Sequence, residues 1–203
     1  NSWYTLKNYG ALTINNDVTV TTRIDAEVNG NPVGGYSSLI ANGYQNSDDR
    51  TNNYDKVTTD NKIPQLTIAG GTFSGGINTI KNDEYSGLEI SGGTFANTTQ
   101  HTVLNYGKAE VSGGEFVVSG SGKAAIWTEY YNTTTPGTLT VSGGEFTSDT
   151  YALVAMNGAD VNITDGIFSA EYAVLANGNT TAVDIEDGDF DGAISSQSPE
   201  FTN

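Results

Sequence analysis

Several residue types are scarce in this chain of 203 residues, and each scarcity removes a class of site. There is no cysteine, which excludes a disulfide framework and any metal site with cysteine ligands. The single histidine, His101, leaves no basis for a zinc site or a Ser-His-Asp arrangement, and we expect it to be a surface residue. No apolar run reaches 18 residues, so no membrane-spanning helix is predicted. The chain has no signal-peptide pattern and begins at Asn1, as expected of a processed or excised piece.

Basic residues are also scarce. Lys and Arg total 8 against 24 Asp and Glu, which gives a formal net charge of −16. A surface of this sign repels nucleic-acid phosphates and anionic membranes, so neither is an expected partner. The remaining polar residues are largely Asn, Thr and Ser, an uncharged composition that suits an extracellular surface.

What the chain does contain is a repeat. The segment Leu-Thr-Val-Ser-Gly-Gly-Glu-Phe at residues 139–146 is one of six related units, each ending in phenylalanine. Successive phenylalanines are separated by 22, 21, 30, 22 and 22 residues. A period near 22 is typical of a solenoid in which each repeat forms one coil. The six positions are Phe73, Phe95, Phe116, Phe146, Phe168 and Phe190.

Positions relative to each phenylalanine predict the local structure. Glycine always stands two residues before it, and aliphatic residues stand five and, with one alanine, seven residues before it. Aliphatic positions two apart share one face of a strand, and the glycine allows a sharp corner. A third short strand follows in each period and is clearest at 151–158 and 173–178.

Stacked coils explain this pattern better than consecutive hairpins. Hairpins do not require the same residue type at the same offset in every unit, whereas stacked coils place each side chain on its counterpart about 4.8 Å away. A left-handed solenoid would show a hexapeptide rhythm with about 18 residues per coil. We therefore predict an all-β fold, a right-handed single-stranded parallel β-helix with about 22 residues and three short strands per coil.

We expect a single solenoid domain over residues 1–203. Residues 1–10 are predicted to cap the first coil, and residues 11–65 to form degenerate first coils with an insertion at 44–62. Residues 66–194 are predicted to be regular coils, with an insertion near 127–137 that accounts for the spacing of 30. Residues 195–203 form a C-terminal tail.

The aliphatic-x-Val/Ile-Ser-Gly-Gly-Thr/Glu-Phe units resemble the right-handed β-helix repeats of pectin-lyase-like proteins over about residues 66–194. More narrowly, they resemble repeat regions of large cell-surface proteins of Gram-positive, often gut, bacteria. The resemblance implies a location on the bacterial surface or in the secreted fraction. It leaves the function open, because that superfamily includes lyases, hydrolases, phage tailspikes and adhesins.

Acidic residues offer three candidate sites, each with a simpler alternative. The resemblance to pectin-lyase-like enzymes draws attention to Asp48 and Asp49, because the hydrolases use paired Asp; this pair lies in a predicted loop without a companion motif, and a solvated loop is the alternative. Alternating acids over 184–191 could form a weak calcium site or serve as surface charge. Glu115 and Glu145 are predicted to lie about 5 Å apart on adjacent coils, where they share a cation or point into water.

Aromatic residues around the insertions are the stronger indication of a ligand site. Aromatic rings stack on the apolar faces of sugars, and tyrosine is enriched in protein interfaces. If both insertions project from one side of the solenoid, they form a shallow cleft with Asp48 and Asp49 available for hydroxyl groups. The alternative is that these rings pack on the solenoid wall. The residues concerned are Trp127, Tyr130 and Tyr131 in one insertion, and Tyr36, Tyr44 and Tyr54 around the other.

The sequence and the resemblance therefore favour a non-enzymatic extracellular module of a bacterial surface protein, which serves adhesion or binds a glycan or protein ligand. The expected partner is a host or dietary glycan or a glycoprotein. We expect the module to be a monomeric domain of a larger protein, with no cofactor unless calcium binds. One rival is a polysaccharide lyase or glycoside hydrolase, although the eight basic residues are scattered rather than clustered. The other is a purely structural spacer.

Overall fold

The computed structural model describes residues 4–22, 37–43, 63–130, 136–178 and 181–197, together with the backbone of 27–28 and 31–32. Over these residues the secondary structure consists of strands joined by turns, and no helix there is long and apolar enough to cross a membrane. The strands are β1 (Leu6–Asn8), β2 (Ala11–Ile14), β3 (Thr19–Thr21), β4 (Glu27–Val28), β5 (Asn31–Pro32), β6 (Ile40–Asn42), β7 (Gln65–Ile68), β8 (Thr72–Ser74), β9 (Ile80–Asn82), β10 (Gly87–Ile90), β11 (Thr94–Asn97), β12 (Val103–Asn105), β13 (Lys108–Val118), β14 (Ala124–Thr128), β15 (Thr138–Ser148), β16 (Tyr151–Met156), β17 (Asp160–Asn177), β18 (Ala182–Ile185) and β19 (Asp189–Ser196).

Seventeen of these strands form one sheet whose strand pairs are all parallel. The first wall consists of β2, β7, β10, the first halves of β13, β15 and β17, and β18. The second wall consists of β3, β8, β11, the later parts of β13, β15 and β17, and the start of β19. The third wall consists of β1, β6, β9, β12, β14, β16 and the ends of β17 and β19.

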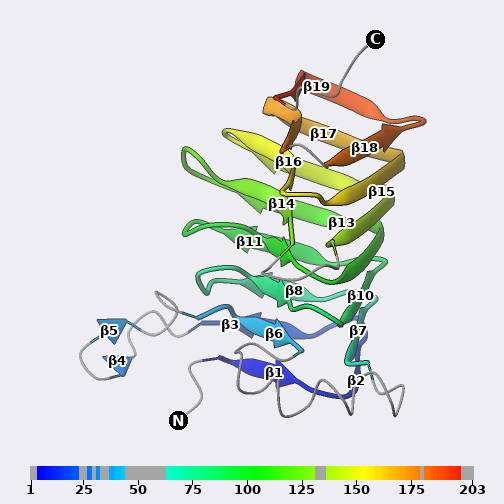
Figure 1. Ribbon diagram of the computed structural model, residues 1–203. Coiled ribbons are helices and arrows are strands. Elements are labelled where there is room, and N and C mark those ends of the chain that lie inside the picture. The colour runs from blue at the N-terminus through cyan, green and yellow to red at the C-terminus, as the bar shows by residue number, and fades with distance from the viewer. Residues whose placement is uncertain are drawn as a thin grey trace.

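The chain passes through the three walls in turn and pairs with the strand of the preceding turn, so the sheet curls around one axis (Figure 1). The first turns lie at one end of the stack and β18 and β19 at the other. This all-parallel, curled sheet is consistent with a parallel β-helix. The remaining two strands, β4 and β5, form a separate antiparallel pair.

The six repeat phenylalanines form one continuous interior row, which confirms the prediction from their spacing. Neighbouring rings are stacked with centroid distances of 4.7–5.0 Å and interplanar angles of 6–15°. The first five rings are fully buried, and Phe190 in the last coil is partly buried. Each stacked pair adds about 0.5–1.5 kcal/mol to the stabilisation from burial.

Glycine is required at the corner between the first and second walls. Gly144 has φ +109°, a region that residues with a side chain rarely adopt. A Cβ at this position would also lie 3.2 Å from the ring of Phe146 and 3.2 Å from the carbonyl oxygen of Gly114 in the preceding coil. The corner glycine therefore permits both the turn and the close stacking of coils.

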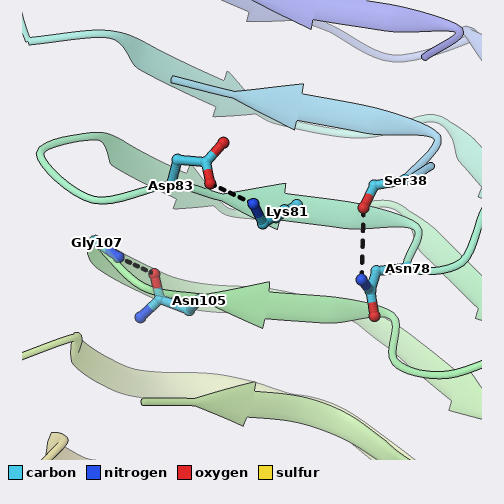
Figure 2. Close-up of polar contacts among 6 residues, drawn as sticks. All are labelled: Ser38, Asn78, Lys81, Asp83, Asn105 and Gly107. Carbon is cyan, nitrogen blue, oxygen red and sulfur yellow. Dashed lines mark hydrogen bonds and ion pairs between the residues drawn. The ribbon is translucent and has the colours of Figure 1, made fainter. Parts of the chain in front are cut away.

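A buried ladder of side-chain amides supports the corner between the third and first walls. In each rung the asparagine Nδ2 donates to the next rung at 2.7–2.9 Å and to a backbone carbonyl at the start of a first-wall strand at 2.8–3.1 Å. Figure 2 shows the rung at Asn105, whose Oδ1 also accepts from the backbone N–H of Gly107. We call these residues the amide ladder: Asn8, Asn42, Asn82, Asn105 and Thr128.

Candidate functional site

The three walls present different outward surfaces. The central outward position of the first wall is polar or acidic on every coil, for example Glu89, Glu110 and Thr140. The second wall is similar at the column that contains Glu115 and Glu145, with Ile167 as the exception. The third wall differs, because its outward column contains Trp127, Val154 and Leu175 on three successive coils, after Leu104 and before Ser195.

These third-wall side chains form a second apolar cluster on the outside of the sheet. Ala124, Val154 and Leu175 are buried there beneath partly buried Trp127, Tyr151 and Met156. Strand register relates them, since Trp127 pairs with Val154 and Val154 pairs with Leu175. Tyr151 and Tyr172 are likewise paired, and their ring centroids are 5.5 Å apart. We call the following residues the aromatic strip: His101, Ala124, Trp127, Tyr151, Val154, Met156, Tyr172 and Leu175.

His101 belongs to this strip and is not the surface residue that the sequence predicted. Its partly buried ring stacks on Trp127 with a centroid distance of 4.9 Å and an interplanar angle of 29°. The backbone N–H of Ala124 donates to its Nδ1 at 3.1 Å, so the neutral imidazole carries its proton on Nε2. Burial lowers the pKa of His101 from 6.5 to about 4. The imidazole is therefore uncharged at neutral pH.

The structure places only part of the predicted aromatic site. Trp127 lies within β14, and the 42%-exposed Tyr130 follows two residues after that strand ends. The aromatic strip places His101, Tyr151 and Tyr172 beside Trp127. These three residues are not part of the aromatic site predicted from the sequence. A signal was present, because Tyr151 and Tyr172 are separated by 21 residues, which is about one period. Six predicted residues lie outside the described part of the chain: Tyr36, Tyr44, Asp48, Asp49, Tyr54 and Tyr131.

The acidic candidates occupy open surface. Glu115 and Glu145 pair on adjacent coils, which confirms the predicted register, and they border a hollow of about 480 Å³ along the glycine corner. The acids over 184–191 are exposed around the last coil. There the Oδ1 atom of Asp187 accepts a hydrogen bond from the backbone N–H of Gly188. Among the described residues, no group of three or more His, Asp or Glu side chains is arranged to hold a metal ion.

Each of the four lysines in the described part of the chain is engaged locally. Lys81 forms a 2.6 Å ion pair with Asp83 (Figure 2), and Lys108 forms a 2.7 Å ion pair with Glu110. Lys7 lies over the ring of Tyr9 at 4.6 Å from its centroid. Lys123 Nζ donates to the backbone carbonyl of Ser119 at 3.1 Å. These lysines do not form one basic cluster for an anionic polymer.

Comparisons of this chain with models of protein families, with curated proteins and with solved structures find no match.

Proposed function

We propose that this chain is a right-handed parallel β-helix module of an extracellular bacterial surface protein, and that it binds its ligand without catalysis. The handedness is supported by the strong right-handed preference of crossovers between parallel strands. The surface location is supported by the acidic, cysteine-free composition and by the resemblance of the repeats to those of bacterial surface proteins.

The ligand of this proposal is a glycan or glycoprotein that docks on the aromatic strip. The observation that carries it is the contrast between walls: aromatic and apolar side chains occupy consecutive coils of the third wall, whereas the described coils of the first wall are polar outside. Partly exposed Trp127, Tyr151 and Tyr172 offer ring surface and polar edges together, as sugar-binding and protein-binding surfaces do. The neutral His101 adds a hydrogen-bond donor at Nε2 without adding charge.

Binding of the protein to arrays of host and dietary glycans and mucins tests this proposal. We expect saturable binding that Trp127→Ala weakens at least tenfold, equivalent to about 1.4 kcal/mol. Ile167→Ala is the matched control, because Ile167 is a 47%-exposed apolar residue on the second wall. Trp127→Phe keeps a ring in the strip and should recover most of the affinity.

Two results would contradict the proposal. The absence of binding to every glycan and glycoprotein would favour a structural spacer. Release of reducing ends or of unsaturated sugars from pectin, alginate or host glycans would favour the rival function, a polysaccharide lyase or glycoside hydrolase. Thermal unfolding of each variant separates loss of the strip from loss of the fold.

A further inference from the structure

A separate groove follows the corner where the third wall meets the first wall. Its volume is about 290 Å³, and we call it the corner groove. One side is lined by Ile63, Tyr85, Tyr106 and Pro136. Each of these residues stands two positions before one of the paired first-wall residues Gln65, Gly87, Lys108 and Thr138. The groove therefore contains one apolar side chain per coil over four successive coils, parallel to the axis.

The groove is hollow because its floor has little side-chain volume. Gly87 and Gly107 both line it. A Cβ on Gly107 would lie 2.5 Å from the carbonyl oxygen of Ser86, and a Cβ on Gly87 would lie 1.9 Å from Oε1 of Gln65. Backbone packing restricts Gly107 to glycine, whereas a side chain at Gly87 would have to displace the flexible end of Gln65, whose amide lies beside the floor.

Tyr85 occupies a conformation that costs free energy. Its φ is +59°, in the left-handed region, where a residue with a side chain pays about 1 kcal/mol or more. Its ring is only partly buried and lines the groove together with Tyr106 on the next coil. Strain of this kind occurs often at ligand sites, and the core does not require this ring.

The backbone beneath the groove is already hydrogen-bonded. The N–H groups of Gly87, Lys108 and Thr138 each donate to a carbonyl of the preceding coil at 2.9 Å. The carbonyl oxygens of the same three residues accept from the amide ladder at 2.8–3.1 Å. An extended peptide recognised through its main chain needs unpaired strand groups, which these floor residues do not offer. Recognition in the groove therefore depends on side chains.

Those side chains favour an uncharged, hydroxyl-rich ligand. Tyr85 and Tyr106 offer ring surface, while Gln65 and Thr138 offer uncharged hydrogen-bonding groups at the groove. The charge of Lys108 is compensated by Glu110 at 2.7 Å, and buried Glu84 adds negative charge at the groove. An anionic sugar would be repelled in this setting and in a chain of net charge −16.

We propose that the corner groove is a binding site for a short, neutral, linear oligosaccharide that lies parallel to the axis. Coils repeat about every 4.8 Å, so a groove crossing four coils is about 14 Å long, which suits two or three sugar rings. Tyr85 and Tyr106 stack on ring faces, and Gln65 and Thr138 bind hydroxyl groups. None of the residues that line this groove belongs to the aromatic strip.

Isothermal titration with neutral trisaccharides of glucose, xylose and mannose, and with trigalacturonic acid as the anionic probe, tests the proposal. We expect saturable binding of at least one neutral trisaccharide and at least tenfold weaker binding of the anionic one. Tyr85→Gly should weaken the neutral ligand at least tenfold while preserving the fold, because glycine relieves the strain at φ +59°. Tyr130→Ala is the matched control, since Tyr130 is exposed and lies outside the groove lining.

Three results would overturn the assignment: no saturable binding of any neutral trisaccharide, preference for the anionic trisaccharide, or equal affinity of the Tyr85→Gly variant and the unaltered protein. Trisaccharide binding that Trp127→Ala weakens and Tyr85→Gly leaves unchanged would place the ligand on the aromatic strip and overturn the assignment to the groove. The two variants together therefore separate failure of the corner groove from failure of the aromatic strip.

Discussion

The third wall changes character halfway along the solenoid, both inside and outside. In the N-terminal half, its last inward position carries an asparagine of the amide ladder, up to Asn105 and then Thr128. In the C-terminal half the paired positions are Ala155 and Ala176. The outward position changes at about the same coil, from Ala41 and Lys81 to an aliphatic and aromatic column that begins at Leu104 and continues with Trp127.

The two halves therefore support the same corner by different means. In the first half, a buried side chain satisfies the carbonyl of the residue that begins the next first-wall strand. In the second half, Asn157 and Gly158 adopt positive φ values of 53° and 85°, and the N–H of Gly158 donates to Oγ1 of Thr181. The first half combines buried amides with positive φ at Tyr85, whereas the second half has positive φ without the buried amides. The phenylalanine row continues unchanged through both halves, which shows that the corner and the core vary independently.

The largest effect is expected from breaking the amide ladder. Asn82 donates to Asn105 Oδ1 at 2.8 Å and to the Lys108 carbonyl at 3.1 Å, and it accepts from Asn42 at 2.8 Å. Asn82→Ala leaves these buried groups unsatisfied and should lower the free energy of unfolding by about 3–4 kcal/mol. Urea unfolding measures this. Asn162→Ala, on the outward face of the first wall, should change it by less than about 0.5 kcal/mol; equal losses would contradict a special role of the ladder.

A smaller effect is expected from titrating His101 in the aromatic strip. The pKa of His101 is about 4 in the folded chain against 6.5 ordinarily, so the unfolded chain binds more protons between these values. This histidine contributes stability that is fully present above pH 6.5 and is lost as the pH falls toward 4. Relative to neutral pH, the loss in the free energy of unfolding is about 2 kcal/mol at pH 5 and about 3 kcal/mol at pH 4.

Urea unfolding between pH 7.5 and 4.5 measures this loss, with His101→Phe as the reference variant. The variant keeps a ring against Trp127. Its free energy of unfolding should fall less steeply as the pH is lowered. The difference in slope between the two proteins should correspond to about one bound proton. Parallel pH profiles of the two proteins would show that His101 titrates normally.

The smallest effect is expected at the corner of the second half. Gly158→Ala places a Cβ at φ +85° and should cost about 1 kcal/mol. Gly10→Ala is the matched control, because nothing lies within 4 Å of its added Cβ and its φ is not in the left-handed region. Thermal unfolding should leave the Gly10 variant unchanged or slightly stabilised. A Gly158 variant as stable as the control would mean that the corner does not depend on this backbone conformation.

The sequence was sufficient to predict the parts of the fold that repeat. Each side chain of one coil lies on its counterpart in the next coil. The phenylalanines and the glycines two residues before them, such as Gly144, therefore recur at regular intervals in the sequence. The amide ladder does not, because its rungs are separated by 34, 40, 23 and 23 residues. Asparagine before glycine also indicates a turn in any sequence. Whether its amide points inward depends on carbonyl groups supplied by a different coil.

The aromatic strip was predictable only in part for a related reason. The clustering of aromatic residues in the sequence predicts a ligand site that includes Trp127 and Tyr130. His101 and Tyr151 come from neighbouring coils, and only the strand register brings them to Trp127. The corner groove was not predicted, because it depends on the absence of side chains at Gly87 and Gly107 beneath two tyrosines.

The matched register of the coils also bears on how such a protein changes length during evolution. A duplication of the DNA between the codons of two equivalent phenylalanines inserts one complete coil. The side chains of the new coil match those of the coils on both sides of it, and the solenoid becomes longer by about 4.8 Å. Recombination between repeats can therefore adjust how far the molecule reaches without requiring a new core.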